Sequence, residues 1–495
     1  MPSEVPRLDM QAAAPQARVR QSTILILATV AGWTLCAALL RNPLYDGLAV
    51  LSSVAILLAS IFFFKWDPPK GREGFRLLGF FVCTQTFLSA GLSVIAQVDT
   101  SPFLFTPTVD AFSFSVEASV IFSLMFMVGA WFTSPGPGER LADEASAGSG
   151  PTPVAAIAIA VLTVLVNLNF ALTPGTNVGR LGTLPLVLLN IGLLTPMVVA
   201  ARLLKPGYSR APIVIILLGQ ATITFYNSML GIVVFTIRDM LLAHIYLRRR
   251  VPVVLIAVTA AIVLLLNPAK MVFRNMAGDQ FSKGPVSFDQ TTENWAEAVS
   301  ATWSPSSRTP DRRIESTADR LNYNWLSAHV YLAVPSRVPY QMGRTLEDIP
   351  MVMTPRLLYP DKPTASGYTR SRWLVQLGIQ DSRSVETTAV SLPAPAEAYW
   401  NFGWLGVFGV PAVLGLMVGA VLRISPRDPV ARVGFVVLLA TTLGQFLDML
   451  VWIVPQFVTV AAAALLATAY CRVGRLLRSS RTANAKPLMR AQHEG

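Results

Sequence analysis

The feature that most limits how this chain can fold is the recurrence of long, nearly uninterrupted apolar runs. A helix needs about 20 predominantly apolar residues to cross the hydrocarbon core of a bilayer. With 495 residues, 53% of them apolar, and a mean hydropathy of +0.51, the chain has material for about twelve such helices. Charged residues make up only 14%, against roughly 25% in soluble proteins. The sequence therefore predicts an all-α polytopic integral membrane protein and excludes a soluble enzyme or a disordered chain.

Twelve runs are expected to cross the membrane. Residues 211–247 are apolar for longer than one helix requires, and Tyr226-Asn227-Ser228 is expected to form the turn of a hairpin. Ten spans with a re-entrant hairpin are the alternative. The predicted spans are 22–40, 47–64, 77–95, 111–131, 154–172, 183–201, 211–226, 228–247, 251–267, 398–422, 433–451 and 453–471.

The net charge of +12 is concentrated in clusters beside alternate spans, such as 65–76, 202–210, 248–250 and 423–432. The positive-inside rule places such clusters in the cytoplasm. A further cluster in the C-terminal tail would also favour anionic membrane lipids. Both termini are therefore expected to be cytoplasmic. Nucleic acid is not an expected partner, because no aromatic and basic module accompanies the charge.

One long polar segment, 268–396, interrupts the pattern of spans. Loops of this length usually have a function, and they can cross the membrane whatever their charge. We expect this segment to be a large loop outside the cytoplasm, with a flexible flap at 275–317 and a denser part at 319–372. The predicted organisation is a cytoplasmic segment 1–21, helices 1–9 in 22–267, the loop 268–396, helices 10–12 in 397–472 and a basic cytoplasmic tail 473–495.

The denser part of the loop holds a group of candidate site residues. Arg320 and His329 are expected on one amphipathic helix, and further cations follow in the chain. The planar guanidinium group of arginine offers several N–H donors in a fixed geometry. It therefore suits a lipid-linked diphosphate held at the membrane surface, since two adjacent phosphates need several donors. The alternative is a solvated loop with ordinary surface ion pairs. The remaining cations of this group are Arg356, Lys362, Arg370 and Arg372.

Three ionisable residues, His329 among them, have both a functional and a structural interpretation. His329 could exchange a proton with a hydroxyl group, or it could simply be packed and hydrogen-bonded. Glu397 could act as a base, or it could be a negative charge favoured at a helix N-terminus. Arg238, beside Asp239 inside the apolar hairpin, is costly in a membrane and so suggests a function, although a structural pair would also account for it.

Several chemistries lack their motifs in this chain. It contains no P-loop, no His-Glu-x-x-His zinc motif and no convincing Gly-x-Ser-x-Gly elbow. The spans contain few acidic residues, which argues against an ion-coupled pump. With no Asp-x-Asp pair, the sequence predicts neither a metal site nor a cofactor.

Three motifs follow one another in the second half of the chain: Val338-Pro339-Tyr340, the run PRLLYPDKP at 355–363, and EAYWNFGWLG at 397–406. In this order the chain resembles the oligosaccharide repeat-unit polymerases, the O-antigen polymerase (Wzy-type) family of bacterial inner membranes. The resemblance covers about residues 210–425. It implies a membrane-embedded glycosyltransferase with the C-type fold.

The resemblance also implies a reaction, and the charges of the candidate residues suggest their roles in it. The donor would be a glycan on undecaprenyl diphosphate and the acceptor another lipid-linked repeat unit. His329 or Glu397 would orient or deprotonate the acceptor hydroxyl, and Arg320 and Arg238 would be secondary diphosphate ligands. The main diphosphate ligands would be Arg356, Lys362, Arg370 and Arg372, which would also stabilise the negative charge that grows as the bond breaks, and Arg356 is the one expected to be catalytic.

Chain-length regulators and flippases of the same pathway would be possible partners. Two other functions remain open from the sequence. An O-antigen ligase shares the donor but transfers the glycan to a different lipid. A polysaccharide or lipid transporter would form no covalent product.

Overall fold

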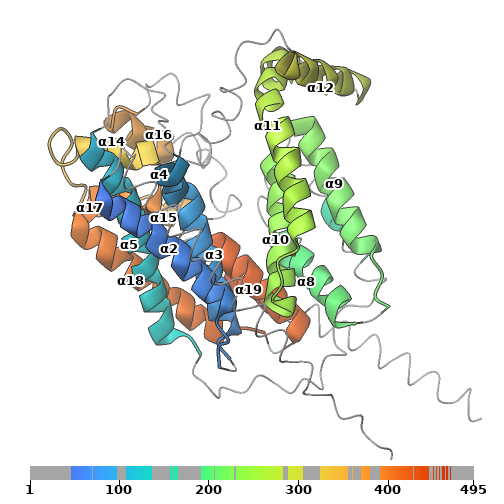
Figure 1. Cartoon of the computed structure of the whole chain (residues 1–495), viewed down its shortest axis with the longest axis horizontal. Coiled ribbons are helices and arrows are strands. Elements are labelled where there is room, and N and C mark those ends of the chain that lie inside the picture. Colours follow the sequence, from blue (N-terminus) through green and yellow to red (C-terminus); the bar gives the residue numbers. More distant parts are fainter. Residues whose placement is uncertain are drawn as a thin grey trace, which may run out of the picture.

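The structure is a computed structural model in which all regular elements of the described residues are helices (Figure 1). The described residues are 46–69, 71–96, 108–135, 157–158, 160–165, 191–205, 207–227, 230–281, 288–304, 324–354, 359, 369–379, 391–426, 428–444, 450 and parts of 453–469. The predicted all-α class is confirmed for this part of the chain. The helices are α2 (Gly47–Lys65), α3 (Glu73–Thr86), η2 (Phe87–Gly91), α4 (Leu92–Ala96), α5 (Val109–Thr133), α8 (Ile191–Leu204), α9 (Ala211–Asn227), α10 (Leu230–Arg248), α11 (Val253–Phe281), α12 (Phe288–Trp303), α14 (Asn324–Ala333), η5 (Arg344–Leu346), α15 (Ile349–Met353), α16 (Thr369–Gln376), α17 (Ala394–Phe402), α18 (Trp404–Arg423) and α19 (Pro429–Leu443).

Among the described residues, six helical segments are long and apolar enough to cross a membrane. Three further apolar helices, within α8, α9 and α19, are shorter. The predicted span 22–40 lies outside the described residues, as do most of 154–172 and parts of 453–471. The six segments are Gly47–Lys65, Glu73–Val94, Val109–Thr133, Leu230–Arg248, Val253–Lys270 and Trp404–Arg423.

The helices form two groups (Figure 1). One group contains α2, α3, α5 and α18 together with the short helices α14 to α17, and the other contains α8 to α12. Helix α19 contacts α3 on one side and α8 and α10 on the other, so it joins the two groups. Side chains of α3, α5, α8, α10, α18 and α19 share one large apolar core.

Helices α5 and α18 approach each other backbone to backbone. A Cβ atom at Gly129 of α5 would lie 2.2 Å from the Ala412 oxygen, and one at Gly415 of α18 would lie 2.1 Å from the Phe126 oxygen. Gly419, four residues after Gly415, is equally close to α5. Such small-residue spacing lets membrane helices pack tightly without a hydrophobic driving force. We call this contact the glycine seam.

Basic residues from distant parts of the chain gather at one end of the bundle, the basic end. Most of their guanidinium groups donate to backbone oxygens near helix C-termini, where the last carbonyls lack partners within the helix. The predicted clusters at 65–76, 248–250 and 423–432 therefore meet in space. The contacts are Arg72 Nε to the Pro135 oxygen (3.1 Å), Arg76 Nη2 to the Tyr246 oxygen (3.3 Å), Arg248 Nη2 to the Leu203 oxygen (3.2 Å), Arg423 Nε to the Thr133 oxygen (2.6 Å) and the ion pair Arg249–Asp67 (2.6 Å).

The opposite end of the bundle, where α14 and α16 lie, is the α14 end (Figure 1). Helix α14 packs on α5 and α17, and its buried face includes Leu326 and Val330. A second apolar core joins α5, α14, α16 and α17 there. The short helices are thus fixed to the long ones by burial of their apolar faces.

Three sequence expectations need correction. The span predicted as 398–422 is broken at Gly403, whose φ of 60° and ψ of −148° end α17 and start α18. The span predicted as 251–267 continues through Pro268 as α11 to Phe281. The flap expected at 275–317 contains the end of α11 and all of α12, because Trp295 and Ala298 of α12 pack on Phe273 of α11.

Two other expectations are confirmed. Residues 211–247 divide into α9 and α10, which pack against each other as the predicted hairpin requires. The expected helix around His329 is α14, which starts at Asn324. Arg320, predicted to lie on the same helix, is outside the described residues.

Candidate functional site

Two of the motifs singled out in the sequence meet at the α14 end. Helix α17 stops at Phe402, so the carbonyl oxygens of its last turn lack the usual donors four residues later. The Gln341 amide donates to the Trp400 oxygen (3.0 Å), and the Met342 amide donates to the Asn401 oxygen (3.1 Å). The two residues that follow the motif Val338-Pro339-Tyr340 therefore complete the C-terminus of the helix that carries the motif at 397–406.

Glu397 lies at the centre of this contact. Its side chain is fully buried, and Oε1 accepts a hydrogen bond of 2.5 Å from the Thr345 hydroxyl. Oε2 accepts one of 2.5 Å from the Leu450 amide. A fully buried carboxylate needs such donors, because burying it without hydrogen-bond partners would cost on the order of 2 to 5 kcal/mol. Glu397 thus connects α17, η5 and the segment at 450.

Asn401, one turn after Glu397 on the same face of α17, extends the network. Its Nδ2 donates to the Thr345 hydroxyl (2.8 Å), and its Oδ1 accepts from the Gly343 amide (2.8 Å). Gly343 has a φ of 91°, a conformation that L side chains rarely adopt, so the loop can present this amide to Asn401. We call Thr345, Glu397 and Asn401 the carboxylate network.

His329 connects α14 to α16. Its Nε2 lies 2.8 Å from the Leu377 oxygen just after α16, a contact in which the nitrogen donates. Trp373 of α16 packs edge-on against Trp400 of α17, with ring centroids 5.6 Å apart. These contacts hold α16, which bears Arg370 and Arg372, beside the motifs of the carboxylate network.

The structure describes only some of the predicted site residues. Arg370 and Arg372 lie on the backbone of α16, but their side chains are outside the described part, as are Arg320, Arg356 and Lys362 altogether. His329, Glu397 and the backbone of α16 are brought together at the α14 end. The roles of these residues as ligands or catalysts stay predictions.

Arg238 lies elsewhere. It sits in the middle of α10, in the other helix group, and pairs with Asp239 at 3.0 Å. Its guanidinium also lies over the rings of Phe81 (5.7 Å) and Phe235 (4.8 Å). These contacts match the structural interpretation of the pair, and the structure does not bring Arg238 to the α14 end.

A cluster of aromatic rings surrounds the start of α18. Phe114 of α5 stacks on Tyr331 at 4.4 Å and meets Tyr399 edge-on at 4.6 Å. Burial, followed by a hydrogen bond to Tyr340, raises the pKa of Tyr399 above its ordinary value, so its hydroxyl stays protonated. Trp400 is fully buried, whereas Trp404 is 38% exposed.

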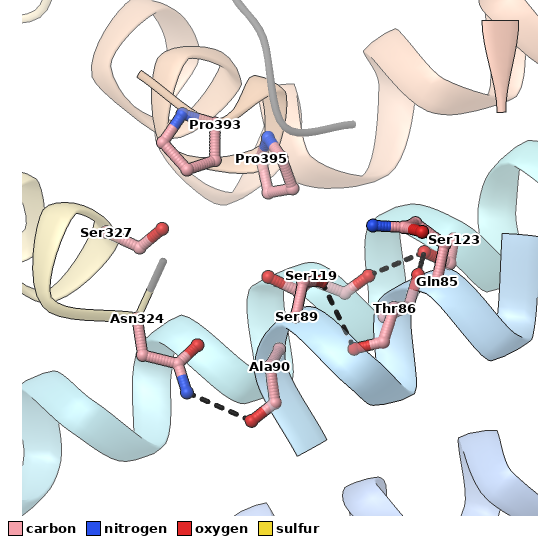
Figure 2. A pocket seen from close by; sticks show the side chains of 10 residues that line it. All are labelled: Gln85, Thr86, Ser89, Ala90, Ser119, Ser123, Asn324, Ser327, Pro393 and Pro395. Atoms are coloured by element: carbon pink, nitrogen blue, oxygen red, sulfur yellow. Dashed lines mark hydrogen bonds between the residues drawn. The ribbon is translucent and has the colours of Figure 1, made fainter. Parts of the chain in front are cut away.

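A pocket opens next to the first turn of α17 (Figure 2). Its walls come from α3 and η2, from α5, from α14 and from α17. The cavity itself is small, about 20 Å³, which is room for one or two water molecules. We call it the hydroxyl pocket, and the residues that line it are Gln85, Thr86, Ser89, Ala90, Ser119, Ser123, Asn324, Ser327, Pro393 and Pro395.

Sequence reasoning missed the carboxylate network's partners and the whole hydroxyl pocket. The spacing of Glu397 and Asn401, four residues apart, could have placed them on one helix face. Ser119 and Ser123 belong to a series of polar residues in the predicted span 111–131, and this series carried a similar signal. Thr345 had none, because its partners are more than fifty residues away.

Within the described residues no group of three His, Cys, Asp or Glu side chains could hold a metal ion. No protein-family model matches the chain, and no significant match exists among curated proteins or solved structures. The fold and the site geometry therefore carry the functional argument.

Proposed function

We propose that this protein is a membrane-embedded glycosyltransferase of the bacterial inner membrane that polymerises undecaprenyl-diphosphate-linked oligosaccharide repeat units into a surface polysaccharide or exopolysaccharide. The observation that carries the proposal is the contact of the motif at 338–340 with the motif at 397–406: Tyr340 packs edge-on against Tyr399, and the next two residues donate to the end of α17. These are two of the three motifs on which the resemblance to repeat-unit polymerases rests. Their meeting at one end of an apolar bundle supports one common site.

The two ends of the bundle support an orientation. The basic end collects arginines from several loops, as expected for the cytoplasmic side under the positive-inside rule. The α14 end then faces the opposite side, where lipid-linked repeat units would be joined. Both termini would be cytoplasmic with twelve spans.

The proposed reaction is a glycosyl transfer. The oxygen of an acceptor hydroxyl attacks the anomeric carbon of the donor glycan, and the bond from that carbon to the diphosphate oxygen breaks. Undecaprenyl diphosphate leaves with the bonding electrons, and the hydroxyl proton passes to a base on the protein. Donors already oriented toward the leaving diphosphate would lower the barrier most.

Residues of the α14 end would share these tasks. Half-buried His329 is more accessible than Glu397, whose carboxylate is held by Thr345 and Leu450. Either would act as the base, Glu397 only after the loop at 341–345 opens. The diphosphate would be held by Arg356, Lys362, Arg370 and Arg372.

The test is incubation of the purified protein with lipid-linked repeat units. Polymerisation gives a ladder of longer lipid-linked products. Transfer of glycan to a different lipid indicates an O-antigen ligase, and the absence of any new covalent product indicates a transporter. Either of the last two results contradicts the proposal.

The largest effect on this assay is expected for Arg356. Its replacement in Arg356→Ala removes a cation proposed to stabilise the leaving diphosphate, which is worth on the order of a hundredfold or more in rate. Cells carrying this variant should make single repeat units without polymer. Wild-type chain lengths on a gel of the extracted polysaccharide would reject the assignment.

A further inference from the structure

The part of the basic end that belongs to the second helix group carries positive charge almost without acidic residues. Residues 202–210, from the last turn of α8 to the start of α9, and residues 248–250, at the end of α10, hold six cations and no carboxylate. Among the described residues, Asp67 pairs with one of these cations, Arg249. We call the six residues the cationic patch, and its members are Arg202, Lys205, Arg210, Arg248, Arg249 and Arg250.

The fold brings the two stretches of the cationic patch together. Arg248 Nη2 donates to the Leu203 oxygen at 3.2 Å, so α8 and α10 end side by side. Helix α9 starts at Ala211 and packs along α10 as a hairpin, which places Arg210 at the same end (Figure 1). Cations held this close repel one another, and the repulsion falls when a negative group binds between them. The patch therefore favours binding of an anion.

The helix dipole accounts for only part of the patch. Arg202 and Arg248 lie in the last turns of α8 and α10, where a cation is favoured. Arg210 directly precedes α9, and Arg250 lies three residues before α11, so both are near the positive ends of helices. These two side chains are exposed, and neither has a hydrogen bond or an ion pair with another described residue. Two arginines are therefore available at positions that the helix dipole does not favour.

Helix α11 starts next to the patch and presents a long apolar surface. Only 11% of its span Val253–Lys270 is buried within the protein, against 33% for α2 and 67% for α5. Val253 and Val254, in its first turn, are the most exposed of its large apolar side chains. In a bilayer such a surface contacts acyl chains, and the lipid headgroups lie at the level where the span begins. The cationic patch would therefore lie at the level of the lipid phosphates.

We infer that the cationic patch and the first turns of α11 bind an anionic phospholipid. Arg210, Arg248 and Arg250 hold its phosphate, since the guanidinium group offers several donors to phosphate oxygens. Its acyl chains lie along Val253 and Val254. Each basic residue near a membrane surface favours an anionic lipid by about fivefold. The site does not depend on the proposed function, because it lies at the end of the bundle away from the α14 end.

The two parts of this surface distinguish an anionic phospholipid from other ligands. A free phosphate or an acidic segment of a soluble protein would satisfy the cations, but neither would use the apolar surface of α11. A zwitterionic lipid would cover α11 but would gain little from the cations. An anionic phospholipid matches both parts at once.

Native mass spectrometry of the full-length, detergent-solubilised protein, titrated with single phospholipids, tests the inference. We expect phosphatidylglycerol to bind at least about tenfold more tightly than phosphatidylcholine with the same chains. The double variant Arg210→Gln/Arg250→Gln should lower the affinity for phosphatidylglycerol by about tenfold or more and leave that for phosphatidylcholine unchanged. Both side chains are exposed and without a partner among the described residues, so the variant should fold like the wild type.

The double variant Arg337→Gln/Arg344→Gln is the matched control. It removes the same charge from two exposed arginines at the α14 end, so the affinity for phosphatidylglycerol should stay unchanged. The inference is overturned if both double variants lose the lipid equally or if phosphatidylcholine binds as tightly as phosphatidylglycerol. It is also overturned if Arg210→Gln/Arg250→Gln binds like the wild type, which would leave orientation as the role of these charges.

A competition experiment identifies the source of the phosphate. Glycerol 3-phosphate carries the phosphate without the acyl chains, so at equal concentration it should not displace bound phosphatidylglycerol. Displacement would show that α11 contributes nothing and would overturn the assignment to a lipid. None of these measurements involves glycosyl transfer, so their outcome is separate from the elongation of lipid-linked units.

Discussion

The two ends of the helix bundle use polar side chains differently. At the basic end, arginines such as Arg72, Arg248 and Arg423 donate to backbone oxygens near helix C-termini. At the α14 end, Glu397 and Asn401 contact a chosen side chain, Thr345, and chosen loop amides. Any cationic side chain long enough to reach a backbone oxygen can make the first kind of contact. The second kind depends on particular residues.

This difference separates charged residues that stabilise the bundle from charged residues that are candidates for chemistry. Positive charge near helix C-termini is favoured by the helix dipole, and in the proposed orientation it also follows the positive-inside rule. The Glu397 carboxylate, in the first turn of α17, is also favoured by a helix dipole, but it is fully buried and is held by particular donors. The proposed function assigns the chemistry to this end of the bundle.

The glycine seam holds together α5 and α18, which connect the two ends. A substitution in the seam tests whether both ends depend on the packing of these two helices. In Gly415→Ala the new Cβ would lie 2.1 Å from the Phe126 oxygen, a backbone atom that cannot turn away. We expect α5 and α18 to separate, with the free energy of unfolding lowered by about 3 kcal/mol. Thermal unfolding of the detergent-solubilised protein measures this.

The control for the seam is Gly409→Ala in the same helix. A Cβ at Gly409 would meet nothing within 4 Å, so stability should be unchanged or slightly raised. Equal melting temperatures for the two variants would show that the close approach of α5 and α18 is not needed.

A smaller effect, confined to the α14 end, is expected from Gly403→Ala. The φ of 60° with ψ of −148° is available to glycine almost alone, and the new Cβ would press against the Tyr340 hydroxyl at 3.3 Å. We expect a loss of about 2 kcal/mol and a disturbed junction of α17 and α18. If this variant melts like Gly409→Ala, the break between these helices is not fixed by Gly403.

The smallest effect is expected at the basic end, from Arg72→Gln. The guanidinium of Arg72 lies 3.8 Å from the centre of the Trp131 ring and donates to the Pro135 oxygen. An exposed cation–π contact is worth about 0.5 to 1 kcal/mol, and a glutamine amide can still reach the carbonyl. Melting should fall by a few degrees at most; a loss as large as that of Gly415→Ala would contradict the proposed division between the two ends.

Much of the fold could be predicted from hydropathy. The apolar runs at 47–64, 111–131 and 228–247 match α2, α5 and α10 to within a few residues. Hydropathy could not locate the break at Gly403, because apolar residues continue on both sides of it. It also could not reveal α12, whose helix is stabilised by packing of Trp295 on Phe273 rather than by a membrane.

The candidate site was predictable in its parts but not in its contacts. The motifs containing Tyr340 and Glu397 could be read from the sequence, and so could the cations between them. Their joining could not, because it depends on α17 ending early and leaving carbonyls for the Gln341 and Met342 amides. The hydroxyl pocket depends in addition on the π-helical turn η2, which no sequence pattern predicts.

The most direct test of the account compares one substitution at each end in the elongation assay. Glu397→Gln keeps the shape of the side chain but removes the charge, and Arg72→Gln removes a charge at the basic end together with the outer part of the guanidinium. With rates normalised to folded protein, we predict a loss of about a hundredfold or more for Glu397→Gln and little change for Arg72→Gln. Equal rates for the two variants, or a greater loss for Arg72→Gln, would contradict the assignment of the chemistry to the α14 end.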